Sequence, residues 1–570
     1  MFISLSFQRF RKLREIFLCC LLAVFSGQLL ANGEMVGNEH LADSWPLALK
    51  EVASVIIPSP EDGASAEILT FHAPTQQLFS VNSMPALIEV FRLSEKLAGG
   101  ISLDHSKTIN VRQDLAAYLD FKSIPSSLGV LTSIDSFNGR NLLVASITSN
   151  LGHAGRGYIA FYRATDAFFI GAVEVGFLPD MVTFTPDGSK ILVANEGEPS
   201  ADYEIDPSGS ISIIHLPIAD KAPNQTQVKD LGLLEYLEAD ALSEVRISPM
   251  ATSIQQDIEP EYIAISPDGL KAYVTLQENN AIATVDLVGE KVIDIWSLGT
   301  KDHSVIGQGL DASDEDGIVN IRPWPVQGLY MPDAIAAYEY NDRTFLVTAN
   351  EGDVREYGSM RDWTEVDKLS CSLQGISGLS SIPDINNDGI GDYRDVLSRS
   401  GLGSLQVEKQ FGKGNEPCAD LLSFGTRSFS IWDSEKKSLV YDSGDQFESI
   451  LALDNPHRFN DYDRRSDNRG PEPEAVALAI LDQRTFAFIG LERAHGIMSY
   501  EITNPRSPRF IAHYSAMGTG PESDAGQPAH RGPEFMEFIG KENSPTNTDL
   551  LAVSYEYSAS IVVYEIVTND

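Results

Sequence analysis

The chain repeats one short phrase five times, and this repeat limits what the chain can fold into. Each copy has an apolar stretch, a turn and a second apolar stretch; in one copy the turn is Pro267-Asp268-Gly269. Apolar stretches joined by such a turn predict a β-hairpin. One acidic residue opens the first stretch and another closes the second. These pairs, 16 to 22 residues apart, are Asp180/Glu196, Glu261/Glu278, Asp333/Glu351, Glu474/Glu492 and Glu534/Glu556.

Repetition of a hairpin predicts a repeat architecture, and the rest of the chain extends it to seven units of four short strands. The last unit offers three strands, and a strand at 53–57 can supply the fourth. We therefore expect an all-β, seven-bladed β-propeller whose N- and C-terminal strands close the last blade. The fifth unit, from Met331, carries a long insertion at 354–424. A β-sandwich array fits less well, because sandwiches do not repeat one hairpin so regularly.

The N-terminus predicts export. Four basic residues between Arg9 and Arg14 precede an apolar run from Ile16 to Phe25. Small residues follow near Ala31, where we expect cleavage. This is the pattern of a secretory signal peptide, which we place at 1–31. A linker at 32–52 and the propeller at 53–570 would follow. No later stretch is apolar enough to span a bilayer, so we expect a soluble monomer in the periplasm or outside the cell.

The composition is strongly acidic, with 81 Asp and Glu against 42 Lys and Arg. This balance argues against nucleic-acid binding, since a phosphate-binding face needs clustered basic residues. It fits a solvated, negatively charged surface that repels other copies of the protein. It also fits a surface that holds hard cations such as calcium.

The paired acids have a special place in a propeller. The first strand of each blade lines the central channel, so both acids of a pair lie at one axial face and several blades aim carboxylates, with amides such as Asn195, Gln277 and Asn350, at one funnel. Such acids repel each other unless a cation or protons lie among them, and oxygen ligands favour calcium or magnesium over zinc. The alternative is that each acid caps backbone amides or pairs with an arginine. The predicted metal ligands are Glu196, Glu278, Glu351, Asp353, Glu492 and Glu556.

Basic residues follow the same positions. We interpret Arg355 and Arg427 as candidates for binding phosphate, because arginine donates two parallel hydrogen bonds to that group. Arg465 and Arg469 lie in a second basic stretch, and Arg493 follows Glu492. A belt of structural salt bridges would give the same pattern.

The insertion contains a second candidate cation site. Oxygen side chains fall at positions 1, 3, 5, 9 and 12 of a calcium-type loop with glycine at position 6. These residues are Asp384, Asn386, Asp388, Asp392 and Asp395. A metal-free acidic turn is the alternative. Cys371 and Cys418 also lie in the insertion and form either a disulfide or two free thiols.

Long phrases of the chain resemble the choice-of-anchor I family of secreted bacterial propellers. The phrases include PDMVTFTPDGSKILVANEGEPS, MPDAIAAYEYNDRTFLVTANEGDVREY and RSDNRGPEPEAVALAI. The resemblance implies a propeller fold and export. Members typically carry a C-terminal anchoring device, whereas this chain stops after its last strand. We therefore expect a protein that is not anchored to the cell surface. Some members are labelled alkaline-phosphatase-like or phytase-like esterases, and others cell-surface glycoproteins.

Two functions remain open. The first is binding of a small-molecule or cell-surface ligand through an acidic, calcium-loaded axial face. The alternative is a calcium-dependent phosphoesterase, in which metal ions activate water and arginines hold the phosphate. The sequence has no G-x-S-x-G, P-loop or H-E-x-x-H motif and assigns no nucleophile or general base.

Overall fold

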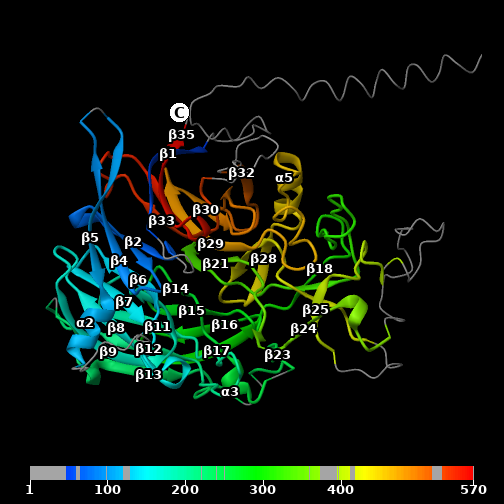
Figure 1. Cartoon of the computed structure of the whole chain (residues 1–570), viewed down its shortest axis with the longest axis horizontal. Coiled ribbons are helices and arrows are strands. Elements are labelled where there is room, and N and C mark those ends of the chain that lie inside the picture. The colour runs from blue at the N-terminus through cyan, green and yellow to red at the C-terminus, as the bar shows by residue number, and fades with distance from the viewer. Residues whose placement is uncertain are drawn as a thin grey trace, which may run out of the picture. The chain divides into compact units, whose positions relative to one another are not determined.

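The hairpin repeat forms four-stranded antiparallel sheets in the computed structural model (Figure 1). Within the residues that the structure describes, there are seven such sheets. The described residues are 47–58, 65–97, 99–119, 129–219, 221–238, 241–249, 251–358, 360–372, 395, 397–410, 418–515 and 529–568.

Each sheet runs through four strands that are neighbours in space. In five of the described sheets these strands are also consecutive along the chain, and the two exceptions are described below. The first three sheets are β2 (Leu69–His72), β3 (Gln77–Asn82), β4 (Leu87–Glu95) and β5 (Ile101–Asn110); β6 (Leu131–Phe137), β7 (Leu142–Ile147), β8 (Arg156–Tyr162) and β9 (Phe169–Phe177); and β10 (Pro179–Phe184), β11 (Lys190–Asn195), β12 (Ser210–His215) and β13 (Val228–Gly232). The next three are β14 (Ile263–Ile265), β15 (Lys271–Leu276), β16 (Ala281–Asp286) and β17 (Lys291–Ser297); β20 (Ile335–Glu339), β21 (Thr344–Ala349), β27 (Phe429–Asp433) and β28 (Ser438–Asp442); and β29 (Pro473–Leu481), β30 (Arg484–Leu491), β31 (Gly496–Glu501) and β32 (Arg509–Ser515). The last is β33 (Pro533–Ile539), β34 (Leu550–Tyr555), β35 (Ser560–Thr568) and β1 (Leu47–Ile56).

Helices are short and lie in connections. The α-helices are α2 (Val111–Tyr118), α3 (Ile254–Asp257) and α5 (Gln446–Asp454). The 3₁₀ turns are η1 (Ala73–Thr75), η2 (Gly152–Ala154), η3 (Gln225–Gln227), η4 (Val366–Lys368) and η6 (Glu556–Ser558). Among the described residues, no helix has the length and apolarity needed to cross a bilayer.

The first strands of the sheets contact one another in a closed circle, which runs through β2, β6, β10, β14, β20, β29 and β33 and back to β2. From each first strand the sheet continues through its second and third strands to its fourth. This is the topology of a β-propeller. It brings the start of every sheet to a shared centre.

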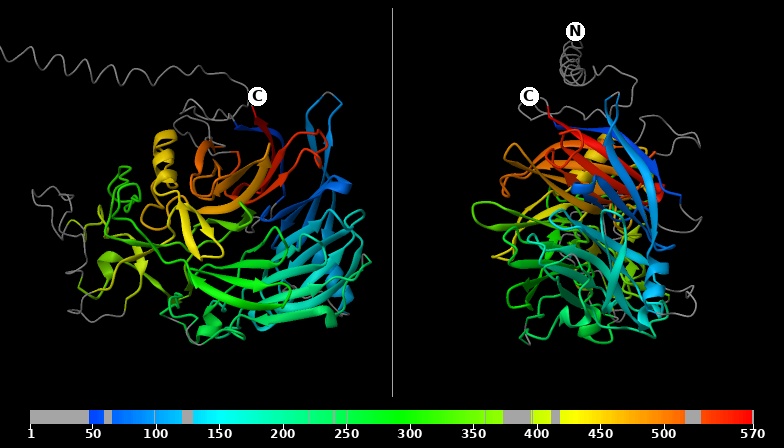
Figure 2. Two further views of the ribbon diagram at one scale, coloured as in Figure 1. Left: turned by 180° about the vertical axis from the view of Figure 1, so that it is seen from behind. Right: turned by 90° about the vertical axis from the view of Figure 1, so that its left-hand side faces the viewer.

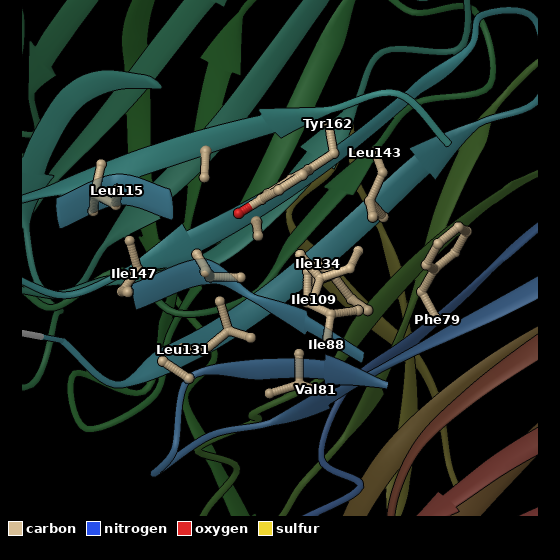
Figure 3. Packing of buried hydrophobic residues seen from close by; sticks show 14 of the residues in the cluster. Phe79, Val81, Ile88, Ile109, Leu115, Leu131, Ile134, Leu143, Ile147 and Tyr162 are labelled. Carbon is tan, nitrogen blue, oxygen red and sulfur yellow. The ribbon is translucent and has the colours of Figure 1, made fainter. Parts of the chain in front are cut away.

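A separate buried apolar cluster fills each of the seven contacts between neighbouring sheets. Figure 3 shows the first, where Val81 and Ile88 of one sheet pack against Leu131, Ile134 and Leu143 of the next. The sheets are apolar on both faces because each face is covered by a neighbour. Since burial of one such side chain contributes about 1.5–3 kcal/mol, these clusters are the main force that holds the sheets together.

The last sheet joins both ends of the described chain. Strand β1 pairs antiparallel with β35, and the two strands lie side by side at the blue and red ends of the colour scale (Figure 2). The strand starts at Leu47, six residues before the expected start at Ala53, in a stretch that we had assigned to a linker. The physical reason is burial: Leu47 and Leu49 are only 4% and 1% exposed, and the Tyr514 hydroxyl donates to the Leu47 carbonyl at 2.6 Å.

The fifth sheet is interrupted between β21 and β27. The intervening chain forms the hairpin β22 (Glu356–Tyr357) and β23 (Met360–Arg361), followed by β24 (Trp363–Glu365), β25 (Gln406–Glu408) and β26 (Leu422–Phe424). The last three join β18 (Thr300–Asp302) and β19 (Gln327–Leu329) in a five-stranded sheet with the order β18-β19-β26-β25-β24. Of the two alternatives left open for Cys371 and Cys418, the structure has the disulfide.

Removal of β1 should destabilise the protein. A chain that begins at Ile57 exposes the edge of β35 and loses the burial of Leu47 and Leu49, which we expect to cost about 3–6 kcal/mol of unfolding free energy. A chain that begins at Ser44 keeps β1 and is the matched control. Denaturant unfolding measures both, and equal stability of the two chains would contradict the closing role of β1.

Candidate functional site

The paired acids converge on one cavity of about 630 Å³, and all ten of them line it. The hairpin register places them there. Pro473 pairs with Leu491 across β29 and β30, so Glu474, the second residue of β29, and Glu492, which follows the end of β30, lie at the same end of the hairpin. The amide of Glu492 donates to the Glu472 carbonyl at 2.8 Å, which holds the end of the hairpin closed. We call this space the acidic cavity.

Carboxylates greatly outnumber basic groups in the acidic cavity. Among the described residues, fourteen carboxylates line it against three guanidinium groups, those of Arg465, Arg469 and Arg493. The six predicted metal ligands are among them. Besides the ten paired acids, the acidic lining residues are Glu67, Glu198, Asp353 and Glu356.

Three of these carboxylates form a tight group. Glu351, Glu474 and Glu492 each offer an oxygen within 4.8 Å of the others, and all three are buried. Oε2 of Glu474 has no hydrogen-bond partner, although the residue is only 8% exposed. A buried unpaired carboxylate oxygen is costly unless a cation or proton satisfies it. This all-oxygen set matches the preference of calcium or magnesium.

Three other oxygens of the group are held by neighbours. Gln277 Nε2 donates to Glu351 Oε2 at 2.8 Å, and Arg469 Nη1 donates to Glu351 Oε1 at 3.0 Å. The Tyr557 hydroxyl donates to Glu492. These contacts fix the directions of two carboxylates toward the third.

A second carboxylate at the cavity is also incompletely paired. Oε2 of Glu278 lacks a partner, and the residue is only 7% exposed. Its neighbour Glu261 is buried as well. The acidic cavity therefore has unsatisfied oxygens on two different sheets.

Burial and mutual repulsion raise the pKa values of most carboxyl groups in the cavity. Burial is the largest cause in each case. It raises the pKa of Glu492 to about 7, with repulsion by Glu472 adding to it, and the pKa of Asp180 to about 7, with repulsion by Asp333. The pKa values of Glu351 and Glu474 lie well above the ordinary range. Some cavity carboxyls therefore carry protons near neutral pH when no cation is bound.

The three arginines are gathered by one buried acid, Glu472. Arg493 Nε donates to Glu472 Oε2 at 3.2 Å, Arg465 Nε donates to Oε1 at 2.5 Å, and Arg469 Nη2 lies 3.5 Å from Oε2. Burial opposes ionisation of Glu472, but the arginines lower its pKa below the ordinary value. The guanidinium groups are thus fixed along one wall of the cavity.

The two arginines predicted to bind phosphate are held elsewhere. Arg355 donates to Glu259 Oε1 at 2.7 Å and to the Asp257 carbonyl at 2.6 Å. Arg427 donates to Glu448 Oε1 at 2.7 Å and to three backbone carbonyls. Both are buried and neither is among the described residues that line the cavity. Both side chains are buried against protein acceptors, and Arg355 Nε, which makes no hydrogen bond, lies 3.6 Å from Asp257 Oδ1. The wall formed by Arg465, Arg469 and Arg493 therefore takes their place in our interpretation.

Two of the three side-chain amides that we expect at the funnel also point away from the acidic cavity. Asn195 Nδ2 donates to Ser212 Oγ at 2.9 Å, and Asn350 Nδ2 donates to Ser430 Oγ at 2.9 Å, so both tie the strands of their own sheets together. Gln277 alone of the three lines the cavity.

The calcium-type loop of the insertion is outside the described residues except for its last member. Asp384, Asn386, Asp388 and Asp392 fall in that part. Asp395 is buried, and its carbonyl accepts a hydrogen bond from the Ser398 hydroxyl at 2.6 Å. The loop stays a prediction.

Comparison with known proteins decides the family. The model of the choice-of-anchor I domain matches residues 67–505, which is most of the chain. The chain belongs to the choice-of-anchor I family.

Two curated relatives are similar to parts of this choice-of-anchor I protein. Gigasin-3a of Magallana gigas is 30% identical over 183 residues, which cover 29% of this chain and 64% of Gigasin-3a. Mesenchyme-specific cell surface glycoprotein of Strongylocentrotus purpuratus is 27% identical over 303 residues, which cover 45% of this chain and 36% of that protein. The chain thus spans less than two thirds of the length of either relative.

Among solved structures, the Pan2 WD40 domain of Neurospora crassa has a TM-score of 0.43 at 10% identity, covering 93% of this chain and 99% of that domain.

Sequence reasoning missed four acids of the choice-of-anchor I site: Glu67, Glu198 and Glu356, which line the cavity, and Glu472, which holds its arginines. Glu67 lines the cavity and receives a hydrogen bond from Ser83, sixteen residues later. Asp180 and Glu196 are also sixteen residues apart, so comparison of the first unit with the third could have found Glu67. Glu472 had no such signal, because its role depends on arginines that only the fold brings to it.

The raised pKa values predict a pH-dependent stability in the absence of divalent cations. The folded protein keeps protons on carboxyls such as Glu492 and Asp180 up to about pH 7, whereas the unfolded chain releases them near pH 4 to 4.5. This contribution to stability is complete below the unfolded pKa and is lost as the pH rises through 7. We expect Tm in a chelator to fall between pH 5 and pH 8.

Calcium should remove most of this slope, because it replaces the protons on the same carboxylates and stabilises the folded state. Differential scanning calorimetry across this pH range, with and without calcium, measures both effects. The same slope under the two conditions would contradict a cation in the acidic cavity.

Proposed function

We propose that this protein is an exported, seven-bladed β-propeller that binds a ligand through calcium ions held in its acidic cavity. The observation that carries the proposal is the group Glu351, Glu474 and Glu492, with its unpartnered Glu474 oxygen. Fourteen carboxylates against three arginines also leave a large excess of negative charge to be compensated. Seven sheets in a closed circle support the blade number, and the N-terminal sequence supports export.

Calcium suits this site better than zinc or magnesium. Zinc prefers nitrogen and sulfur ligands, and among the described lining residues there is no histidine or cysteine. Magnesium requires a compact octahedron, whereas calcium accepts six to eight oxygens in irregular arrangements. Carboxylates that come from several sheets form such an irregular arrangement of oxygens, so they suit calcium better than magnesium. A bound calcium would keep positions open toward the cavity, where an anionic group of a small-molecule or cell-surface ligand can bind.

Replacement of the unpartnered carboxylate tests the cation site. Glu474→Gln keeps the shape of the side chain and removes its charge, so we expect calcium affinity to fall by about tenfold or more. Glu339→Gln changes an exposed glutamate at the other end of a first strand and should leave the affinity unchanged. Isothermal titration calorimetry measures both variants. Equal calcium affinity in Glu474→Gln and the parent protein would refute this site, as would a parent protein that binds no calcium.

Phosphoester hydrolysis is the second candidate function, and the arginine wall favours it. Arg469 contacts Glu351, and Arg493 Nη2 lies 3.3 Å from Glu492 Oε1, so positive groups border the proposed cation site. In this arrangement the carboxylates hold the metal ions, and the arginines orient a phosphate and stabilise charge on its oxygens. Bound calcium would supply Lewis acidity and lower the pKa of a water molecule.

An arginine substitution separates hydrolysis from binding alone. If hydrolysis is the function, the purified protein hydrolyses phosphomonoesters or phytate in the presence of calcium, and Arg469→Gln lowers kcat/KM by about 10- to 100-fold. Arg464→Gln is the matched control, because Arg464 lies in the same segment but is exposed and pairs with Asp461.

Absence of calcium-dependent turnover in the parent protein would exclude the esterase and leave the binding function. Turnover that survives both Glu351→Gln and Glu492→Gln would place the reaction outside the acidic cavity.

A further inference from the structure

Two of the seven sheets break the acidic repeat. At the positions of the paired acids, the first sheet has Glu67 and Ser83, and the second has Thr132 and Thr148. Both threonine hydroxyls are engaged within the protein: Thr132 Oγ1 donates to the Pro179 carbonyl at 2.6 Å, and Thr148 Oγ1 accepts from the Val130 amide at 2.9 Å. The second sheet therefore adds no charge to the cavity wall.

A second pocket opens at this uncharged sector. It has a volume of about 470 Å³ and shares Thr132, Asp180, Glu196 and Glu198 with the acidic cavity, so the two spaces adjoin. We call it the side pocket. Its own lining is largely apolar and includes Met84, Val130, Leu178 and Pro179.

Apolar side chains of the side pocket are exposed to solvent. Met84 is 52% exposed and Val130 is 37% exposed. Leu151, which is 65% exposed, precedes two residues that line the pocket, Gly152 and His153. Exposed apolar groups gathered at a pocket are typical of a ligand site.

The basic groups at the side pocket are held by the backbone. Arg112 Nη2 donates to the Met84 carbonyl at 2.7 Å and to the Gly129 carbonyl at 2.8 Å. His153 Nδ1 donates to the Glu198 carbonyl at 2.8 Å. These contacts position the rim segments beside the apolar surface.

We infer that the side pocket binds the apolar substituent of a small organic phosphate whose phosphate group lies in the acidic cavity. The inference rests on the proposed function. A phosphate cannot lie beside Asp180 and Glu196 without repulsion, whereas an uncharged aryl or alkyl group gains burial there and needs no counter-charge. The ligand class is a phosphate monoester with an apolar substituent, not inorganic phosphate.

Filling the side pocket tests the inference. In calcium-loaded protein we expect 1-naphthyl phosphate to bind about tenfold or more tightly than inorganic phosphate, because only the first ligand buries an apolar group. Val130→Trp should abolish this preference while leaving the affinities for calcium and inorganic phosphate unchanged. Val288→Trp places the same bulk on a surface that is 75% exposed and is the matched control.

A neutral probe separates failure of the side pocket from failure of the cation site. We expect 1-naphthol to bind to the parent protein in calcium and in chelator, and to lose affinity in Val130→Trp but not in Val288→Trp. Loss of calcium binding with this naphthol pattern intact would refute the proposed function and keep the side pocket as an apolar site. Calcium and phosphate binding without a naphthyl preference, or a preference that survives Val130→Trp, would overturn the inference.

Discussion

Repulsion among buried carboxylates, imposed by the closed circle of first strands, is the constraint on which the chemistry of this protein depends. Apolar packing between neighbouring sheets holds the circle together. The hairpin ends then have to aim their acids at one cavity. Folding therefore uses hydrophobic burial to hold an unfavourable charge arrangement in place. A cation or protons must relieve it, which is why the same residues are expected to control both ligand binding and the pH dependence of stability.

The charge of the cavity lining differs around its circumference, and this difference can orient a ligand. Glu472 gathers three arginines on one wall, next to Glu351 and Glu492. The second sheet instead presents threonines whose hydroxyls are already bonded, and an apolar pocket opens beside them. A uniformly acidic funnel would concentrate cations without selecting a ligand. A wall with arginines and a neutral sector can orient a molecule that has an anionic end and an apolar end.

Much of the architecture was predictable because the relevant interactions are local in sequence. A hairpin brings residues 16 to 22 apart to the same end of two strands, so the repeat itself indicated that Glu474 and Glu492 lie together. The arginines were less predictable. The partners of Arg355 and Arg427 lie about twenty to a hundred residues away, at Asp257, Glu259 and Glu448. The direction in which a long arginine side chain points depends on such distant partners. The neighbouring residues in the sequence therefore do not predict it.

The sequence by itself determined the strands, the hairpins and the acids at their ends, because turn residues and apolar alternation act over a few positions. Only the tertiary structure decided which acids share a cation-sized space, which arginines border it and where the neutral sector opens. The physical reason is that electrostatic contacts across the circle join different sheets. Their distances are set by how the sheets pack, so the position of a charge along the chain does not specify the charge that it meets.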